Sequence, residues 1–304
     1  MKVLVTGAGG YIGSMLVPRL LHRDWRVTAF GRFHLGLPFL AASCADRNLD
    51  IVRGDVRTID AALLARHDAI VNLAALVGNA PCDADPAAAM DTNWKAVERL
   101  VGMLSLKQIM IQPTSDAGYL SGIDVCTEAS PLRPTSVYGR SKVGAERMVT
   151  ARGGISLRLA SVFGMSPRMR LDLMVNQFVW DAIYGRTAEL FDAHHRRNFV
   201  HVRDVVSAVL HSIDNYPAML GEAFNCGLAL PLTKLQLCEK IAAQVPGFEW
   251  RESAVGADPD RHDCVVSNEK MKRAGWQPRH SVDSGITELV KGYQMMREGE
   301  LPNG

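Results

Sequence analysis

Short apolar runs alternate with helical patterns through the first half of the chain. The runs have the length and composition of buried strands, and they lie at residues 2–7, 25–32, 49–56, 68–76, 107–115 and 154–164. Residues 11–24 and 86–105 place apolar side chains at helical spacing, and another helix is predicted to begin near Ser136. Strands that alternate with helices predict an α/β fold in which a doubly wound parallel sheet is covered on both faces.

This alternation ends after about Phe163. Helical stretches at residues 172–185 and 202–214 then mix with short strands and turns, as in residues 221–233. We therefore expect a sheet domain over residues 1–165 and a smaller C-terminal α/β lobe over residues 166–304. Residues 194–215 are expected to return to the sheet, so the two parts interleave in the sequence.

Composition and charge narrow the classes of function. The chain has 304 residues, of which 47% are hydrophobic, and its formal net charge of +2 is too small to favour nucleic acid or an anionic membrane as a partner. Its apolar runs are shorter than the roughly 18 residues that a membrane helix needs, and its N-terminus is typical of a first strand. Six isolated cysteines without a CxxC pair predict no metal site and a reducing, cytoplasmic location.

The segment "GAGGYIG" joins the first strand to the first helix. Its glycines are Gly7, Gly10 and Gly13, in the frame of a dinucleotide-binding loop. Gly7 permits a sharp turn, Gly10 lets the backbone approach a pyrophosphate, and Gly13 lets the helix lie close to the sheet. The amides at the helix N-terminus favour phosphate. The pattern predicts a Rossmann domain that binds NAD or NADP.

The end of the second strand bears on the choice between these two cofactors. An acidic residue there would accept a hydrogen bond from the ribose 2′-hydroxyl of NAD, but this chain has Gly31 followed by Arg32. A guanidinium can bind a 2′-phosphate, which tilts the prediction toward NADP, although Arg32 could instead stack on adenine or face solvent. Asp55, after the third strand, could accept from the adenine amino group or could cap the next helix.

Tyr138 and Lys142 in "SVYGRSK" are four residues apart, which places them on one face of a helix. A free phenol has a pKa of about 10, too high for an effective base at neutral pH. An ammonium roughly 4 Å away would favour the phenolate by about 4 kcal/mol before screening. The pair is therefore predicted to make a proton-transfer tyrosine, although both residues could also be ordinary surface residues.

A hydroxyl at the end of the preceding strand completes the candidate site. The segment "IQPTSD" places Ser115, with Thr114 as the alternative, at the carboxyl edge of the parallel sheet. Ligands of open α/β sheets bind at this edge, so Ser115 is well placed to hydrogen-bond a substrate oxygen. Either hydroxyl could instead only begin a turn.

Together these segments resemble the extended short-chain dehydrogenase/reductase family, in particular its NAD-dependent nucleotide-sugar epimerases and dehydratases. The resemblance covers nearly the whole chain and includes "TGAGGYIG", "GDV", "NLAA", "DTNWKA", "SVYGRSKVGAE", "RLASVFG", "RNFVHVRDVV", "FNCG" and "NEKMKRAGWQP". It implies that Tyr138 transfers the proton, that Lys142 binds the nicotinamide ribose, and that Ser115 contacts the reacting sugar oxygen.

The resemblance also implies a set of binding residues. Further cofactor contacts are expected at Tyr11, Ile12, Val56, Leu73, Ala74, Ala75 and Asn93. Substrate contacts, several of them to a nucleotide diphosphate, are expected at Asp116, Asn176, Arg197 and Arg261. Each arginine could alternatively form a surface ion pair. A homodimer in which residues 86–105 pack with the Tyr138 helix is a further expectation.

One departure from the family pattern bears on the reaction. The sugar dehydratases carry an Asp-Glu pair after the catalytic hydroxyl, and here Asp116 is followed by Ala117. Dehydration needs both an acid and a base, so the sequence favours a nucleotide-sugar epimerase that uses transient hydride transfer. The alternatives are an NADPH-dependent reductase of 4-keto nucleotide sugars, a dehydratase, and a cofactor-binding scaffold without catalysis.

Overall fold

The structure of the chain is a computed structural model that describes residues 1–34, 38–120, 124–253 and 263–296. Its centre is a seven-stranded sheet in the order β11-β6-β5-β4-β1-β2-β3, with every neighbouring pair parallel. The strands are β1 Lys2–Thr6, β2 Arg26–Gly31, β3 Leu49–Arg53, β4 Ala69–Asn72, β5 Ile109–Ser115, β6 Ile155–Leu159 and β11 Ala223–Cys226. The order of β1 to β6 is that of the Rossmann fold, which confirms the predicted fold class.

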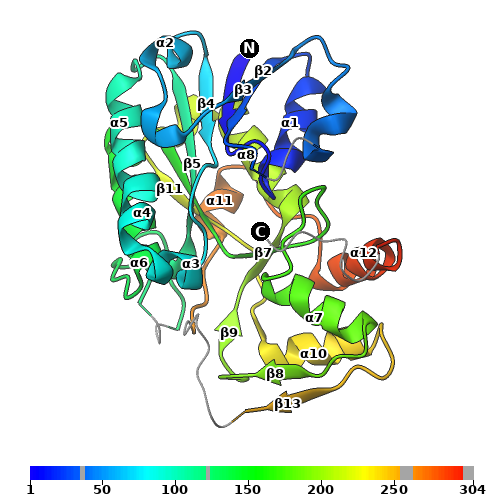
Figure 1. Cartoon of the computed structure of the whole chain (residues 1–304). Coiled ribbons are helices and arrows are strands. Elements are labelled where there is room, and N and C mark those ends of the chain that lie inside the picture. Colours follow the sequence, from blue (N-terminus) through cyan, green and yellow to red (C-terminus); the bar gives the residue numbers. More distant parts are fainter. Residues whose placement is uncertain (35–37, 121–123, 254–262, 297–304) are drawn as a thin grey trace.

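Helices cover both faces of this sheet (Figure 1). One face carries α1 (Gly13–Leu21) and α8 (Val202–Asp214), and the other carries α5 (Ala96–Met103) and α6 (Val137–Ala151). Neighbouring residues of β5 enter opposite cores: Ile111 belongs to the α1/α8 core, whereas Met110 belongs to the α5/α6 core. This alternation explains why the strands are apolar at nearly every position.

Shorter helices complete the sheet domain. They are α2 Ala61–Leu64, α3 Asn79–Ala84, α4 Pro86–Met90, α9 Tyr216–Met219 and α11 Glu269–Arg273, with 3-10 turns η1 Pro38–Ser43, η2 Val56–Thr58 and η4 Asp116–Gly118. The helix expected over residues 86–105 is divided by a π-helical turn, η3 (Asp91–Lys95). π-helical turns often occur at functional sites, and Asn93 lies in this one.

The seventh strand corrects the sequence-based view of residues 221–233, which placed this segment in the smaller lobe. β11 pairs in parallel with β6, and Phe224 and Cys226 enter the α1/α8 core. A four-residue strand carries too short a pattern to reveal its partner. α8 also contacts α1 and β5, so residues 202–226 return to the sheet as one continuous segment.

The smaller lobe lies below the carboxyl edge of the sheet in Figure 1. Its core joins α7 (Met174–Ile183), α10 (Lys234–Ala242) and α12 (Val282–Gln294), with Phe163 and Tyr293 fully buried between them. Its short strands are β7 Ser161–Phe163, β8 Ala188–Leu190, β9 Arg196–Arg197, β10 Phe199–His201, β12 Leu232–Thr233 and β13 Trp250–Glu252. Among the described residues, none of the helices combines the length and apolar character needed to cross a bilayer.

Candidate active site

The glycine loop has no room for side chains where the cofactor pattern requires glycine. Gly7 has a φ of +65°, and a Cβ there would lie 2.7 Å from the Ala74 amide nitrogen and 2.8 Å from the Leu73 carbonyl carbon. A Cβ on Gly13 would lie 2.5 Å from the Gly7 carbonyl oxygen. Ile12, which precedes α1, provides no side-chain cap for the amides of the first turn. The loop therefore has the close-packed backbone that lets a pyrophosphate approach the start of α1.

The loop after β4 is fixed on both sides. The Ala74 amide donates to the Thr6 hydroxyl over 3.1 Å. The Leu76 amide donates to the Asn93 side-chain oxygen over 2.8 Å, and the Asn93 amide group donates back to the Leu76 carbonyl over 2.8 Å. The same amide group also donates to the Ser141 hydroxyl over 3.0 Å. Asn93 thus ties the predicted cofactor loop, residues 73–76, to the helix that carries Tyr138.

Ser115, Tyr138 and Lys142 meet at the carboxyl end of β5. The Ser115 side chain lies close enough to the Tyr138 hydroxyl to act toward lowering its pKa. The Lys142 ammonium lies 5.8 Å from the centroid of the Tyr138 ring and donates to the Pro113 carbonyl over 3.4 Å. The Ser136 hydroxyl caps α6 by accepting from the Gly139 amide over 3.0 Å, which sets where the helix begins. The three residues predicted to be catalytic therefore lie together.

The electrostatics of this group differ from the sequence-based expectation. In the chain alone, burial raises the pKa of Tyr138 above its ordinary value, so the predicted net lowering of this pKa is wrong here. Burial also lowers the pKa of Lys142 to about 8, because the charged amine is costly to desolvate. The cause is shared: the enclosure that excludes water penalises both phenolate and ammonium.

The shifted pKa of Lys142 predicts how stability depends on pH. Between about pH 8 and its ordinary pKa of 10.5 the unfolded chain holds a proton on Lys142 that the folded chain has lost. The free energy of unfolding therefore rises with pH in this window, by at most about 1.4 kcal/mol per pH unit. We expect urea unfolding from pH 8 to 10 to show this rise in the wild type relative to Lys142→Met. The exposed control Lys291→Met should follow the wild type, and a Lys142→Met difference that is flat with pH would contradict the shift.

A cation that the sequence analysis missed lies near Tyr138. The positive charge of Arg170 acts to lower the pKa of Tyr138, against the effect of burial. The Arg170 Nε donates to Asp172 over 2.9 Å, which holds the guanidinium in place. Arg170 lies in the irregular segment between β7 and α7, outside every recognisable motif, so only the folded chain brings it to the site.

Basic side chains gather where the adenosine ribose of a dinucleotide is expected. Arg32 follows β2 and is exposed, and Arg53 ends the neighbouring strand β3, opposite Gly31. After burial, the charge of Arg32 is the largest influence that lowers the pKa of His34, and Arg53 acts in the same direction. The three basic groups therefore lie near one another.

Asp55 lies beside this group and is already engaged. Its carboxylate caps η2 and accepts from the Arg57 amide over 2.9 Å and from the Arg57 guanidinium over 2.7 Å. These hydrogen bonds lower the pKa of Asp55 to about 2. Of the two roles considered for Asp55, the structure realises the turn cap. The Val56 side chain enters the α5/α6 core, which leaves only its backbone facing the loop.

Three further residues predicted to bind ligands, Tyr11, Asn176 and Asp116, make hydrogen bonds within the chain. The Tyr11 hydroxyl donates to the Gly164 carbonyl over 2.6 Å, and the Asn176 amide group donates to that hydroxyl over 3.3 Å and to the Arg170 carbonyl over 3.0 Å. The side chains of Tyr11 and Asn176 thus join α1, β7 and α7. Asp116 lies beside Ser115, whose hydroxyl donates to it over 3.3 Å.

Arg197 and Arg261 were both expected to grip a nucleotide diphosphate. Arg197 is buried in β9, where it pairs with Leu232 of β12 in the smaller lobe. Arg261 lies outside the described residues.

Comparison with known proteins supports the same family as the geometry. A model of the NAD dependent epimerase/dehydratase family matches residues 3–227. The chain is 30% identical over 315 residues to the low-salt glycan biosynthesis protein Agl12 of Haloferax volcanii, covering 96% of this chain and 98% of that protein. It is 27% identical to a UDP-glucose 4-epimerase of Mycolicibacterium smegmatis, covering 97% of this chain and 99% of the epimerase.

Solved structures share the fold over nearly the full length. The UDP-glucuronic acid 4-epimerase of Bacillus cereus, in complex with UDP-glucuronic acid and NAD, superposes with a TM-score of 0.88 at 19% identity and covers 97% of this chain and 99% of that one. DesIV of Streptomyces venezuelae, a dTDP-glucose 4,6-dehydratase with NAD bound, gives a TM-score of 0.85 at 26% identity and covers 97% of each chain. With its glycine loop and its Ser115, Tyr138 and Lys142 group, the chain belongs to the NAD-dependent epimerase/dehydratase family of extended short-chain dehydrogenase/reductase enzymes.

Proposed function

We propose that the chain is an NAD(P)-dependent nucleotide-sugar epimerase. The observation that carries the proposal is the grouping of Ser115, Tyr138 and the buried Lys142 at the carboxyl end of β5, in a site where Ala117 follows Asp116. A tyrosine in this place can exchange a proton with a sugar hydroxyl. The second carboxylate that would support elimination of water is missing from this segment, so the site favours epimerisation over dehydration.

The residues around the glycine loop fit a nicotinamide dinucleotide. The amides after Gly10 would hold the pyrophosphate at the start of α1, and the 73–76 loop would border the cofactor opposite them. Lys142 would reach the nicotinamide ribose, within the face of α6 that carries Tyr138. The absence of side chains at Gly7 and Gly13 keeps this cradle narrow, since a Cβ at either position would meet backbone atoms.

The chain's own groups would move the proton and hold the sugar. A bound nicotinamide supplies the acceptor and donor of the hydride at the sugar carbon. Ser115 would hydrogen-bond the reacting oxygen, and the Tyr138 oxygen would take its proton as the carbonyl forms. After the keto sugar turns in the site, Tyr138 would return the proton to the oxygen on the new face. Arg170 would stabilise the phenolate form of Tyr138 through its positive charge.

Substrate analysis tests this proposal directly. The purified protein would be incubated with UDP- and dTDP-hexoses and hexuronic acids in the presence of NAD or NADP, and the products resolved by proton NMR. We expect a single epimer to accumulate while absorbance at 340 nm stays constant. A protein that binds the cofactor but converts none of these nucleotide sugars would refute the proposal.

The pair of Arg32 and Arg53 favours a second candidate, an NADPH-dependent reductase of 4-keto nucleotide sugars. Two guanidinium groups near the expected ribose position suit a 2′-phosphate, which NADP has and NAD lacks. A reductase consumes its cofactor, so steady loss of absorbance at 340 nm with a keto sugar would identify this activity. The same residues serve both reactions, and the net cofactor balance separates them.

Arg32→Gln tests the preference for NADP. Losing the guanidinium should weaken NADPH binding by about tenfold and leave NADH binding within about twofold, because one charge-assisted hydrogen bond is worth roughly 1.5 kcal/mol or more. Nicotinamide fluorescence titration measures both. Arg26→Gln, at the opposite end of the same strand, is the matched control. An equal effect on both cofactors would place Arg32 away from the 2′-position.

The remaining expectations concern substrate grip, assembly and location. We propose that Arg197, with Arg261, holds the nucleotide diphosphate of the substrate, and that two copies associate through α5 and α6. The six cysteines, Cys44, Cys82, Cys126, Cys226, Cys238 and Cys264, are free thiols, which fits a reducing cytoplasm.

A further inference from the structure

A buried ion pair links the catalytic helix to the sheet. The Glu146 side chain lies on α6, four residues beyond Lys142, and Arg158 lies on β6. Arg158 binds the Glu146 carboxylate through two parallel hydrogen bonds, from Nε over 2.9 Å and from a terminal nitrogen over 2.6 Å. Both residues are only 5% exposed. A two-point guanidinium–carboxylate contact of this kind fixes orientation as well as distance.

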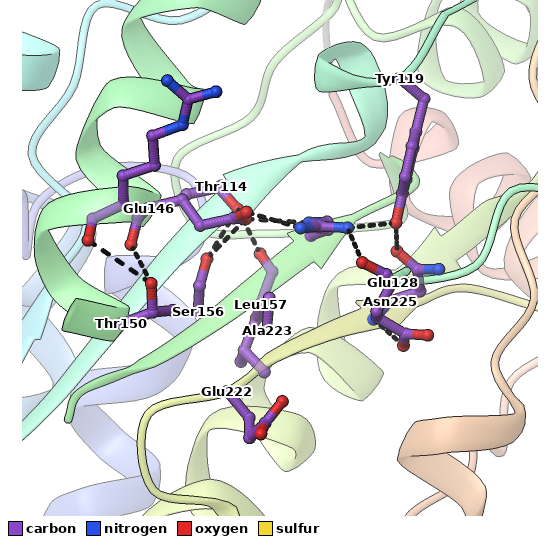
Figure 2. Close-up of polar contacts among 12 residues, drawn as sticks. Thr114, Tyr119, Glu128, Glu146, Thr150, Ser156, Leu157, Glu222, Ala223 and Asn225 are labelled. Carbon is purple, nitrogen blue, oxygen red and sulfur yellow. Dashed lines mark hydrogen bonds and ion pairs between the residues drawn. The ribbon is translucent and has the colours of Figure 1, made fainter. Parts of the chain in front are cut away.

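The pair also holds the residue just before Ser115. The Thr114 hydroxyl is hydrogen-bonded to the Ser156 hydroxyl over 2.9 Å, and Ser156 donates to the Glu146 carboxylate over 3.1 Å. The Thr114 oxygen itself lies 3.3 Å from the same carboxylate. Figure 2 shows Thr114 and Ser156 converging on one end of Glu146. The last residue of β5 before the catalytic serine is therefore anchored to α6.

Tyr119, the residue just after the Ser115 turn, is held by Arg158, the other member of the ion pair. The second terminal nitrogen of Arg158 donates to the Tyr119 hydroxyl over 2.5 Å, and that hydroxyl donates to Asn225 of β11 over 2.7 Å. The Arg158 guanidinium also lies 5.1 Å from the centroid of the Tyr119 ring. In Figure 2, Tyr119 and Asn225 stand at the end of the network opposite Thr114.

We propose that Glu146 and Arg158 are positioning residues that set the distance between the Ser115 and Tyr138 hydroxyls. Thr114 and Tyr119 flank the Ser115 turn on its two sides, and both contact this one ion pair, whose Glu146 lies on the Tyr138 helix. The pair thus connects the segment that carries Ser115 to the helix that carries Tyr138, and so fixes the positions of the two catalytic hydroxyls relative to each other. This inference rests on the proposed role of Ser115 and Tyr138 in proton transfer.

Glu146→Gln tests the pair with little change in volume. It keeps an acceptor for Thr114 but removes the charge that holds Arg158. We expect kcat to fall about ten- to a hundredfold, because small misplacements of reacting groups cost this much. The dissociation constant of the cofactor and the KM of the sugar should change less than threefold. Glu222→Gln removes the carboxylate of an exposed ion pair with Lys270 and is the matched control, expected to keep wild-type kcat.

Two further measurements separate positioning from bulk stability. Tyr119→Phe removes only the hydroxyl that links Arg158 to Asn225, and it serves if Glu146→Gln does not fold. Crystal structures of the variants give the Ser115–Tyr138 oxygen separation, which should lengthen. A variant with lowered Tm but wild-type kcat and an unchanged separation would overturn the inference. If the wild type itself turns over no nucleotide sugar, the proposed function fails, and the crystallographic separation still decides this inference.

Discussion

Replacing Tyr138 with phenylalanine is expected to lower kcat by about 10³-fold, within the range that general acid–base groups contribute. The change removes one oxygen, the one beside Ser115, and leaves the ring that packs beside Lys142. Cofactor affinity should therefore stay within about threefold, since the amides and Lys142 are untouched. Turnover by product NMR and titration of cofactor fluorescence measure the two effects on the same preparation.

A second tyrosine provides the control for this substitution. Tyr184 in the smaller lobe donates its hydroxyl to the Met296 carbonyl over 3.0 Å, so Tyr184→Phe removes the same atom far from the glycine loop and should keep near-wild-type turnover. Unchanged turnover in Tyr138→Phe would remove the phenol from the mechanism. Loss of cofactor binding in that variant would instead show that Tyr138 organises the dinucleotide site.

Gly7→Ala is expected to weaken cofactor binding and to destabilise the chain. An alanine at a φ of +65° is strained, and its Cβ would lie within 2.9 Å of three backbone atoms of Leu73 and Ala74. Together these effects should cost about 2–4 kcal/mol of the free energy of unfolding. They should also shift the loop enough to weaken NAD(P) by about tenfold or more. Urea unfolding and fluorescence titration measure the two losses.

Gly102 in α5 is the matched control for this glycine substitution. A Cβ there meets no atom within 4 Å. Gly102→Ala should therefore stabilise the helix by about 0.5–1 kcal/mol and leave cofactor affinity unchanged. If Gly7→Ala behaves like Gly102→Ala, the steric account of the glycine loop is incorrect.

Local patterns predicted the fold and the centre of the site because both depend on residues close in sequence. The glycine loop, the Ser136 cap and the four-residue spacing of Tyr138 and Lys142 are determined within one strand–helix or helix unit. The position of Ser115 at the carboxyl end of β5 follows from the strand pattern itself. For these features, the residues that determine the local geometry are neighbours in the sequence, so the sequence pattern predicts both.

Features that depend on distant contacts could not be read this way. Arg170 reaches Tyr138 only because the β7–α7 segment folds back over the site. The raised pKa of Tyr138 reflects burial by many elements, whereas the sequence showed only its neighbour on the helix. The partners of Glu146 likewise come from β5 and β6, so "SKVGAE" alone gave no sign of an ion pair.

The late position of β11 has a consequence for how the polypeptide is made. All five residues of β6 are buried in the finished sheet, and within the described part of the chain β11 is the strand that covers one of its edges. On a translating ribosome this edge stays open while β7, α7 and β8 emerge, until Cys226 leaves the exit tunnel. A nascent chain arrested before that point therefore displays a bare apolar strand edge, which makes it a substrate for chaperones and a nucleus for aggregation.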